Sequence, residues 1–71
     1  METFDEFYAE YQKLDSGIKT LVRRVATMEL QEYGYEEIGS SDVSCQVYSL
    51  RKSLGSYEAI ITHGLNMIRN S

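Results

Sequence analysis

The chain has 71 residues and a single cysteine, Cys45, so it can form one small domain (residues 1–71) with no internal disulfide and too few soft ligands for a zinc site. Eleven acidic residues against seven basic ones give a formal charge of −4, which disfavours direct binding to nucleic acid. No apolar run approaches the roughly 20 residues that cross a bilayer, and an acidic start and a lone cysteine predict a cytoplasmic protein.

The first predicted helix is Thr3–Tyr33. Thr3 and Glu6 have the spacing of a capping box. Gly17 costs about 1 kcal/mol in a helix interior, and either residue of Asp15–Ser16 could cap a new helix at this point. The apolar spacing nevertheless continues across the segment without losing phase. This continuity favours one long helix, bent near Gly17.

A polar, glycine-bearing connection follows the first helix. Gly34 is a natural helix end, and Ser41 or Asp42 is expected to cap the second helix, Asp42–Arg69. Gly55 is a possible break within this second helix, because the serine that follows it can cap a new one. The second helix is therefore predicted as one long helix that could be broken at Gly55, as the first could be at Gly17.

The start of the second helix has an alternative interpretation. Val43, Cys45 and Val47 alternate as in a strand, and Tyr33–Ile38 could pair with them as a hairpin. Helical spacing of apolar residues, however, runs from Val43 through the rest of the segment. We therefore predict a helix here and keep the strand as the alternative.

Apolar side chains recur every three or four residues along both predicted helices, at the mean spacing of 3.5 that coiled coils show. The pattern predicts an all-α fold of two long antiparallel helices, a helical hairpin. Four apolar residues that flank the stripe are expected to be exposed, which suggests that two hairpins pair into a homodimeric four-helix bundle: Val22, Ile60, Leu65 and Met67. A core of this size rarely supplies more than about 3–5 kcal/mol alone, which also favours an oligomer. The predicted core and dimer seam comprises Phe4, Phe7, Tyr11, Leu14, Ile18, Leu21, Val25, Met28, Val47, Leu50, Leu54, Ile61, Leu65 and Ile68.

No complete catalytic, cofactor-binding or metal-binding set is found in the sequence. Cys45 and His63 would lie roughly 27 Å apart on a continuous helix, at 1.5 Å per residue, so within one such chain they cannot form a nucleophile–base pair. Only a dimer or a break at Gly55 could bring them together, and a buried thiol and a surface imidazole are expected instead. Residues 34–41 have the glycine spacing of a phosphate loop, but Ser40 stands where the lysine is needed. We expect no enzymatic activity, no cofactor and no metal.

Two groups of residues are candidates for binding a protein partner. Glu2, Glu6 and Glu10 recur every four residues, with Asp5 beside them, and about 6 Å separates successive members. This spacing resembles that of neighbouring phosphates, so the column could occupy the basic groove of a nucleic-acid-binding protein; a solvated helix face is the alternative. The second group consists of tyrosines outside the stripe, a residue type enriched at interfaces: Tyr33, Tyr35 and Tyr48.

The sequence therefore predicts a non-enzymatic protein-binding module, an acidic inhibitor or adaptor of a nucleic-acid-binding protein. In size and charge it is comparable to small phage proteins with anti-defence or antirepressor character. One alternative is a DNA-binding regulator with a helix-turn-helix between Ile18 and Ile61. A purely structural oligomerisation module is the other.

Overall fold

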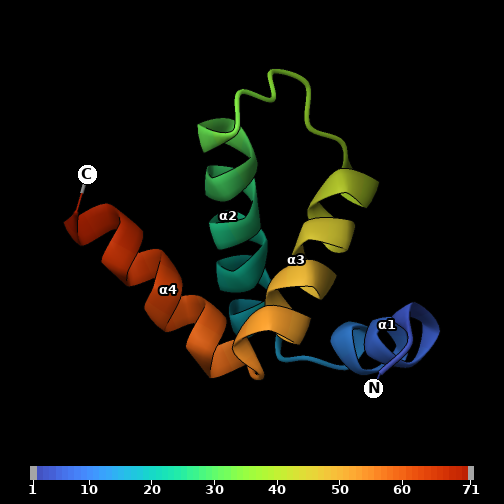
Figure 1. Ribbon diagram of the computed structural model, residues 1–71. Coiled ribbons are helices and arrows are strands. Elements are labelled where there is room, and N and C mark those ends of the chain that lie inside the picture. Colours follow the sequence, from blue (N-terminus) through green and yellow to red (C-terminus); the bar gives the residue numbers. More distant parts are fainter. Residues whose placement is uncertain (1, 71) are drawn as a thin grey trace.

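The computed structural model describes residues 2–70, and all regular secondary structure within them is helical (Figure 1). The all-α prediction is therefore confirmed, and the alternative strand around Val43–Val47 is wrong. Two long helices are not observed, because each predicted helix is divided in two. The helices are α1 (Phe4–Gln12), α2 (Ser16–Glu32), α3 (Ser40–Leu54) and α4 (Tyr57–Arg69).

The first predicted helix is divided at Asp15, ahead of the glycine at which we expected a bend. The Asp15 carboxylate accepts a hydrogen bond from the backbone N–H of Gly17 (3.0 Å) and so caps α2. The backbone N–H groups of Lys13 and Leu14 bond to carbonyls three residues back, which tightens the end of α1. At the start of α1, Thr3 is the N-cap as predicted, and it accepts a hydrogen bond from the Glu6 N–H.

The second predicted helix is divided at Gly55, where the sequence allowed a break. Gly55 has a φ of +89°, a left-handed conformation that glycine adopts without strain, and Ser56 caps α4 by accepting from the Ala59 N–H. The expected start of this segment was two residues late, because α3 begins at Ser40. Neither Ser41 nor Asp42 is the N-cap, which is Gly39. Asp42 is the third residue of α3, and its carboxylate accepts a hydrogen bond from the Gly39 backbone N–H (2.9 Å).

Each helix contributes one of the four largest fully buried side chains: Phe7, Val22, Val47 and Ile60. We expected Val22 and Ile60 to be exposed flanks, and this prediction is wrong. The buried stripe of α2 lies about one residue out of phase with the predicted seam. Ile18 and Leu21 on α2 are consequently exposed, and four seam members on the other helices are exposed as well: Phe4, Leu54, Leu65 and Ile68.

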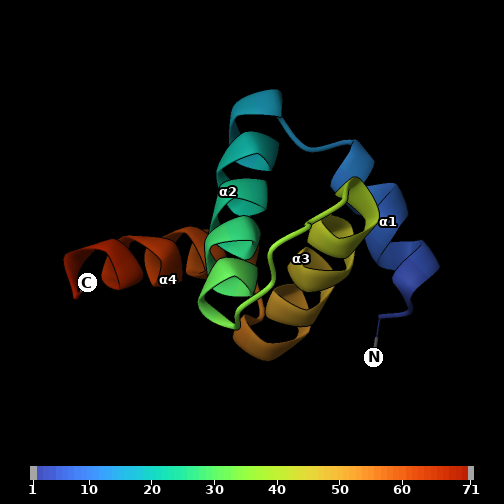
Figure 2. The same ribbon diagram turned by 90° about the horizontal axis from the view of Figure 1, so that it is seen from above.

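The four helices are arranged with α2 and α3 in the middle, while α1 and α4 lie on opposite sides of this pair (Figures 1 and 2). α2 packs against both α3 and α4, and α1 packs against α3. Figure 1 shows that α4 diverges from α2 toward the C-terminus. None of the helices found in residues 2–70 combines the length and apolarity needed to cross a membrane.

The Arg23 side chain fixes the angle between α1 and the central pair. Its guanidinium donates hydrogen bonds to the Tyr11 hydroxyl (2.7 Å) on α1 and to the hydroxyls of Ser40 (3.2 Å) and Ser44 (3.3 Å) on α3. One α2 side chain thus connects three helices. A continuous α1–α2 helix would carry Tyr11 along the α2 axis and away from these partners.

Candidate protein-binding surface

Apolar side chains gather on the outer side of α2 and α4, where no other helix covers them. Leu21 is 48% exposed and Leu65 is 58% exposed, although both belong to the predicted seam. Partly buried neighbours complete a nearly continuous apolar strip between the two helices. We call this strip the α2/α4 face; it comprises Leu21, Arg24, Met28, Ile61, Leu65 and Ile68.

The α2/α4 face exists because α4 crosses α2 closely at one point. Gly64 is buried there, and a Cβ added to it would overlap the Val25 Cγ2 methyl. The glycine therefore lets the two backbones approach, and α4 diverges from α2 beyond the crossing. Small residues commonly have this function where helices pack closely. The sequence pattern showed Gly64 only as a gap in the apolar stripe.

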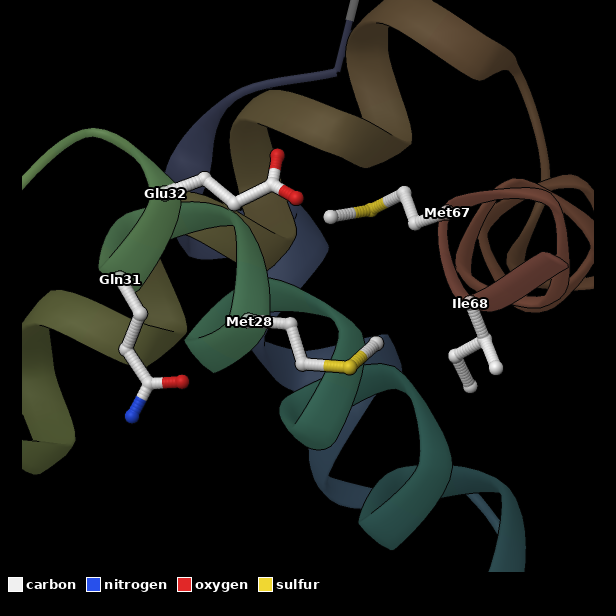
Figure 3. Close-up of a pocket in the computed structure, with 5 residues that line it drawn as sticks. All are labelled: Met28, Gln31, Glu32, Met67 and Ile68. Atoms are coloured by element: carbon white, nitrogen blue, oxygen red, sulfur yellow. The ribbon is translucent and has the colours of Figure 1, made fainter. Parts of the chain in front are cut away.

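Beyond the crossing, the two helices border a hollow of about 350 Å³. Met28, Gln31 and Glu32 line it from α2, and Met67 and Ile68 line it from α4 (Figure 3). In Figure 3 the Met28 and Ile68 side chains point toward each other across the gap. The hollow is open and carries one carboxylate at its rim, so it suits an apolar side chain better than a charged small molecule.

A polar cluster around the buried Glu29 connects α2 with the partly buried Gln46 of α3 and His63 of α4. Glu29 is only 8% exposed, and its two carboxylate oxygens contact Gln46 Nε2 and His63 Nε2, each at 2.6 Å. The negative charge of Glu29 is the main cause of a raised pKa at the Tyr33 phenol. Sequence reasoning missed this cluster and expected His63 to be a surface imidazole. The sequence did contain a signal: Glu29 lies four residues after Val25 and three after Ala26, so on a helix it shares a side with these two apolar residues.

The acidic residues predicted to bind a partner lie on and just before α1, on the side of the molecule opposite α4. Asp5, Glu6 and Glu10 are exposed. Glu6 accepts a hydrogen bond from the Thr3 hydroxyl (3.0 Å), and Glu10 lies 3.8 Å from the Arg51 guanidinium.

Glu2 is less free than the other members of this group. Partial desolvation, followed by its neighbour Glu10, raises the pKa of the Glu2 carboxyl. Glu2 and Glu10 thus interact with each other and with Arg51, so the column is partly engaged within the chain.

The three candidate tyrosines do not form one patch. Tyr33 and Tyr35 are exposed next to and within the α2–α3 connection. Tyr48 instead packs on α1, with its ring centroid 5.2 Å from that of Phe4 and 5.1 Å from that of Phe7. Its hydroxyl donates to the Glu2 carbonyl (3.0 Å). Tyr48 therefore anchors α1 to α3.

The two residues considered for nucleophilic chemistry lie in different environments. His63 is bound to Glu29, whereas Cys45 is exposed and borders a surface hollow with Phe4 and Tyr8. The expectation of a buried thiol is therefore wrong. Among residues 2–70, no three His, Cys, Asp or Glu side chains are grouped closely enough to hold a metal ion.

Compared with known proteins, the chain matches no family model, no curated protein and no solved structure.

Proposed function

We propose that this chain is a non-enzymatic protein-binding module that acts in the cytoplasm and docks through its α2/α4 face. The observation that carries the proposal is the exposure of Leu21 and Leu65 on a single face whose other members are apolar except for Arg24. Scattered exposed apolar residues are common on protein surfaces, but contiguous apolar patches mark interaction sites. The aliphatic and thioether side chains that border the face can repack around a partner's side chains.

The charges on α4 favour a protein partner over nucleic acid. A two-residue turn, Gly55–Ser56, joins α3 to α4 in an order that resembles a helix-turn-helix. The second helix of such a motif needs cations for the phosphates as well as base-reading side chains on its outer side. α4 has exposed polar side chains at Thr62 and Asn66, but its only arginine or lysine is Arg69 at the last position, and its histidine is bound to Glu29. Salt-sensitive retardation of duplex DNA by the pure chain would contradict this argument.

A matched pair of leucine variants tests the proposed surface. Leu65→Glu places a charge on the α2/α4 face, whereas Leu54→Glu places the same charge at the C-terminus of α3. Both sites are exposed, so neither substitution buries a carboxylate. The tagged chain is expressed in its native host, and the proteins that co-purify, untagged copies of the chain included, are identified by mass spectrometry. We expect recovery with Leu65→Glu to fall about tenfold or more, as for an interface hot spot, and recovery with Leu54→Glu to match the unsubstituted chain. Equal recovery with both variants would contradict the proposal.

Inhibition of a nucleic-acid-binding protein is a second candidate function, supported by the exposure of acidic side chains on α1. In this proposal the α1 acids occupy the partner's basic groove and keep nucleic acid out of it. The α1 acids and the α2/α4 face lie on opposite sides of the molecule, so the two surfaces can be tested separately.

Charge reversal tests this second function. Glu2, Glu6 and Glu10 are changed together to lysine, and the control changes Glu36, Glu37 and Glu58 to lysine, which alters the net charge equally. Loss of partner binding only with the α1 triple variant, with an unchanged helical circular dichroism spectrum, supports the acidic inhibitor. If the two triple variants weaken binding equally, α1 affects binding only through the net charge of the chain, and the acidic-inhibitor proposal is contradicted.

A further inference from the structure

We infer that the α2/α4 face binds a second copy of this chain. The two copies pack about a two-fold axis that passes near Met28, with the two α2 helices antiparallel and with Arg24 of each copy beside Glu32 of the other. The inference rests on the proposed docking surface and specifies its occupant.

A positive and a negative side chain of α2 lie at equal distances on either side of Met28. Arg24 and Glu32 each lie four residues from Met28, which is about 6 Å along the helix on either side. Arg24 lines the apolar hollow at the crossing, and Glu32 lines the larger hollow beyond it. In a two-fold dimer the same patch meets itself, so a positive and a negative group equidistant from the axis face each other twice. Met28 then packs on its own symmetry mate.

Arg24 is available for such an intermolecular pair. Its side chain is exposed, and it forms no ion pair with any residue in 2–70. Arg24 and Glu32 cannot satisfy each other within one chain, because eight residues separate them by about 12 Å along α2. Arg23, its neighbour, by contrast donates hydrogen bonds to side chains of α1 and α3.

The distribution of the remaining charge does not oppose self-association. The chain has a net charge of −4, and two copies repel if their acidic surfaces meet. The acidic residues of α1, however, lie across the α2–α3 pair from the α2/α4 face (Figures 1 and 2). Packing through the α2/α4 face keeps the α1 acids of the two copies apart and buries Leu21 and Leu65.

A charge-swap cycle on the full chain tests the inference. We expect sedimentation equilibrium at micromolar concentrations to give twice the 8.2 kDa mass of one chain. Arg24→Glu or Glu32→Arg alone places like charges together at two symmetric positions, and each should raise the dimer dissociation constant about tenfold or more. The double variant Arg24→Glu/Glu32→Arg restores opposite charges and should recover most of the affinity. Lys13→Glu and Glu58→Arg are off-face reversals and should leave the mass unchanged.

The outcomes separate this inference from the proposed function. A monomeric chain at these concentrations would overturn the inference, as would a double variant no better than the single ones. If the chain is monomeric but Leu65→Glu still abolishes capture of a different protein, the proposed docking surface stands and only its occupant was wrong. If Leu65→Glu changes neither dimerisation nor capture, both proposals fail. Unchanged circular dichroism spectra show that the variants remain folded.

Discussion

The Tyr57 hydroxyl at the start of α4 is buried but makes no hydrogen bond of normal geometry. The ring itself is well placed, because the Arg51 guanidinium lies 5.3 Å from its centroid. Burial, followed by the negative charge of Glu10, raises the pKa of the Tyr57 phenol above its ordinary value of 10.0. The contact of the ring with Arg51 and the lack of a partner for the hydroxyl indicate that the ring stabilises the fold and the hydroxyl does not.

The paired variants Tyr57→Phe and Tyr48→Phe test this distinction. We expect Tyr57→Phe to leave the free energy of unfolding unchanged or to raise it by up to about 1 kcal/mol, since it removes an unsatisfied polar atom. Tyr48→Phe deletes the hydrogen bond to the Glu2 carbonyl and should cost about 0.5–1.5 kcal/mol. Urea unfolding at neutral pH measures both. A larger loss with Tyr57→Phe than with Tyr48→Phe would show that the Tyr57 hydroxyl has a partner in solution.

The raised pKa of Tyr57 also predicts a dependence on alkaline pH. Because the folded chain holds this proton more tightly than the unfolded chain, the contribution of Tyr57 to stability is fully present below the unfolded pKa. It is lost as the pH rises through the folded pKa. Stability of the unsubstituted chain should therefore fall more steeply above pH 10 than that of Tyr57→Phe. Parallel curves would contradict the raised pKa.

At the scale of whole helices, the sequence predicted the type of secondary structure but not where α1 ends. The apolar spacing passes through Leu14 without losing phase, because the three-residue link between α1 and α2 is close to one helical turn. Periodicity alone cannot detect such a break. The signal that was present is chemical: Asp15 followed by Gly17, whose N–H it caps.

The sequence also predicted the wrong face of α2, for a physical reason. Two overlapping stripes were possible, one with Leu21 and Met28 and the other with Val22 and Glu29. A charged residue in a core is costly, so pattern analysis favours the first stripe. The structure buries Glu29 because Gln46 and His63, which are distant in the sequence, hydrogen-bond its carboxylate. This long-range compensation, and with it the exposed α2/α4 face, could not be predicted from local spacing.

The crossing of α2 and α4 gives a prediction about how helices pack. Gly64→Ala should lower the free energy of unfolding by about 1–3 kcal/mol, because its methyl group overlaps the Val25 side chain. Adding Val25→Ala removes the overlapping methyls, so the double variant should lose less than the sum of the two single variants.

Gly17→Ala is a suitable control for the glycine substitution. It lies at the exposed start of α2, where the added methyl approaches only the Asp15 carboxylate. Alanine gains up to about 1 kcal/mol in helix propensity at such a site. We expect a small change of either sign by chemical denaturation. Equal destabilisation at positions 17 and 64 would show that the effect does not come from the close crossing.

At the scale of the whole molecule, all four helices contribute to one small core, so no pair of helices buries enough apolar surface to be stable alone. The largest buried side chains come one from each helix, so a cooperative unfolding transition is expected. A domain of this size has little stability in reserve. Burial of the α2/α4 face in a dimer would therefore supply a substantial part of the stability of the fold.

This coupling between folding and association predicts a melting temperature that depends on protein concentration. A ligand that binds only the folded state stabilises it by mass action, and a second copy of the chain acts as such a ligand. We expect the melting temperature to rise by several degrees across a hundredfold range of concentration, since roughly 1 kcal/mol shifts a small domain by about 4–8 °C. Leu65→Glu should melt at a lower temperature that does not change with concentration, while Leu54→Glu should keep the dependence. A concentration-independent melting temperature for the unsubstituted chain would mean that the four helices are stable as a monomer and leave the α2/α4 face free for a different protein.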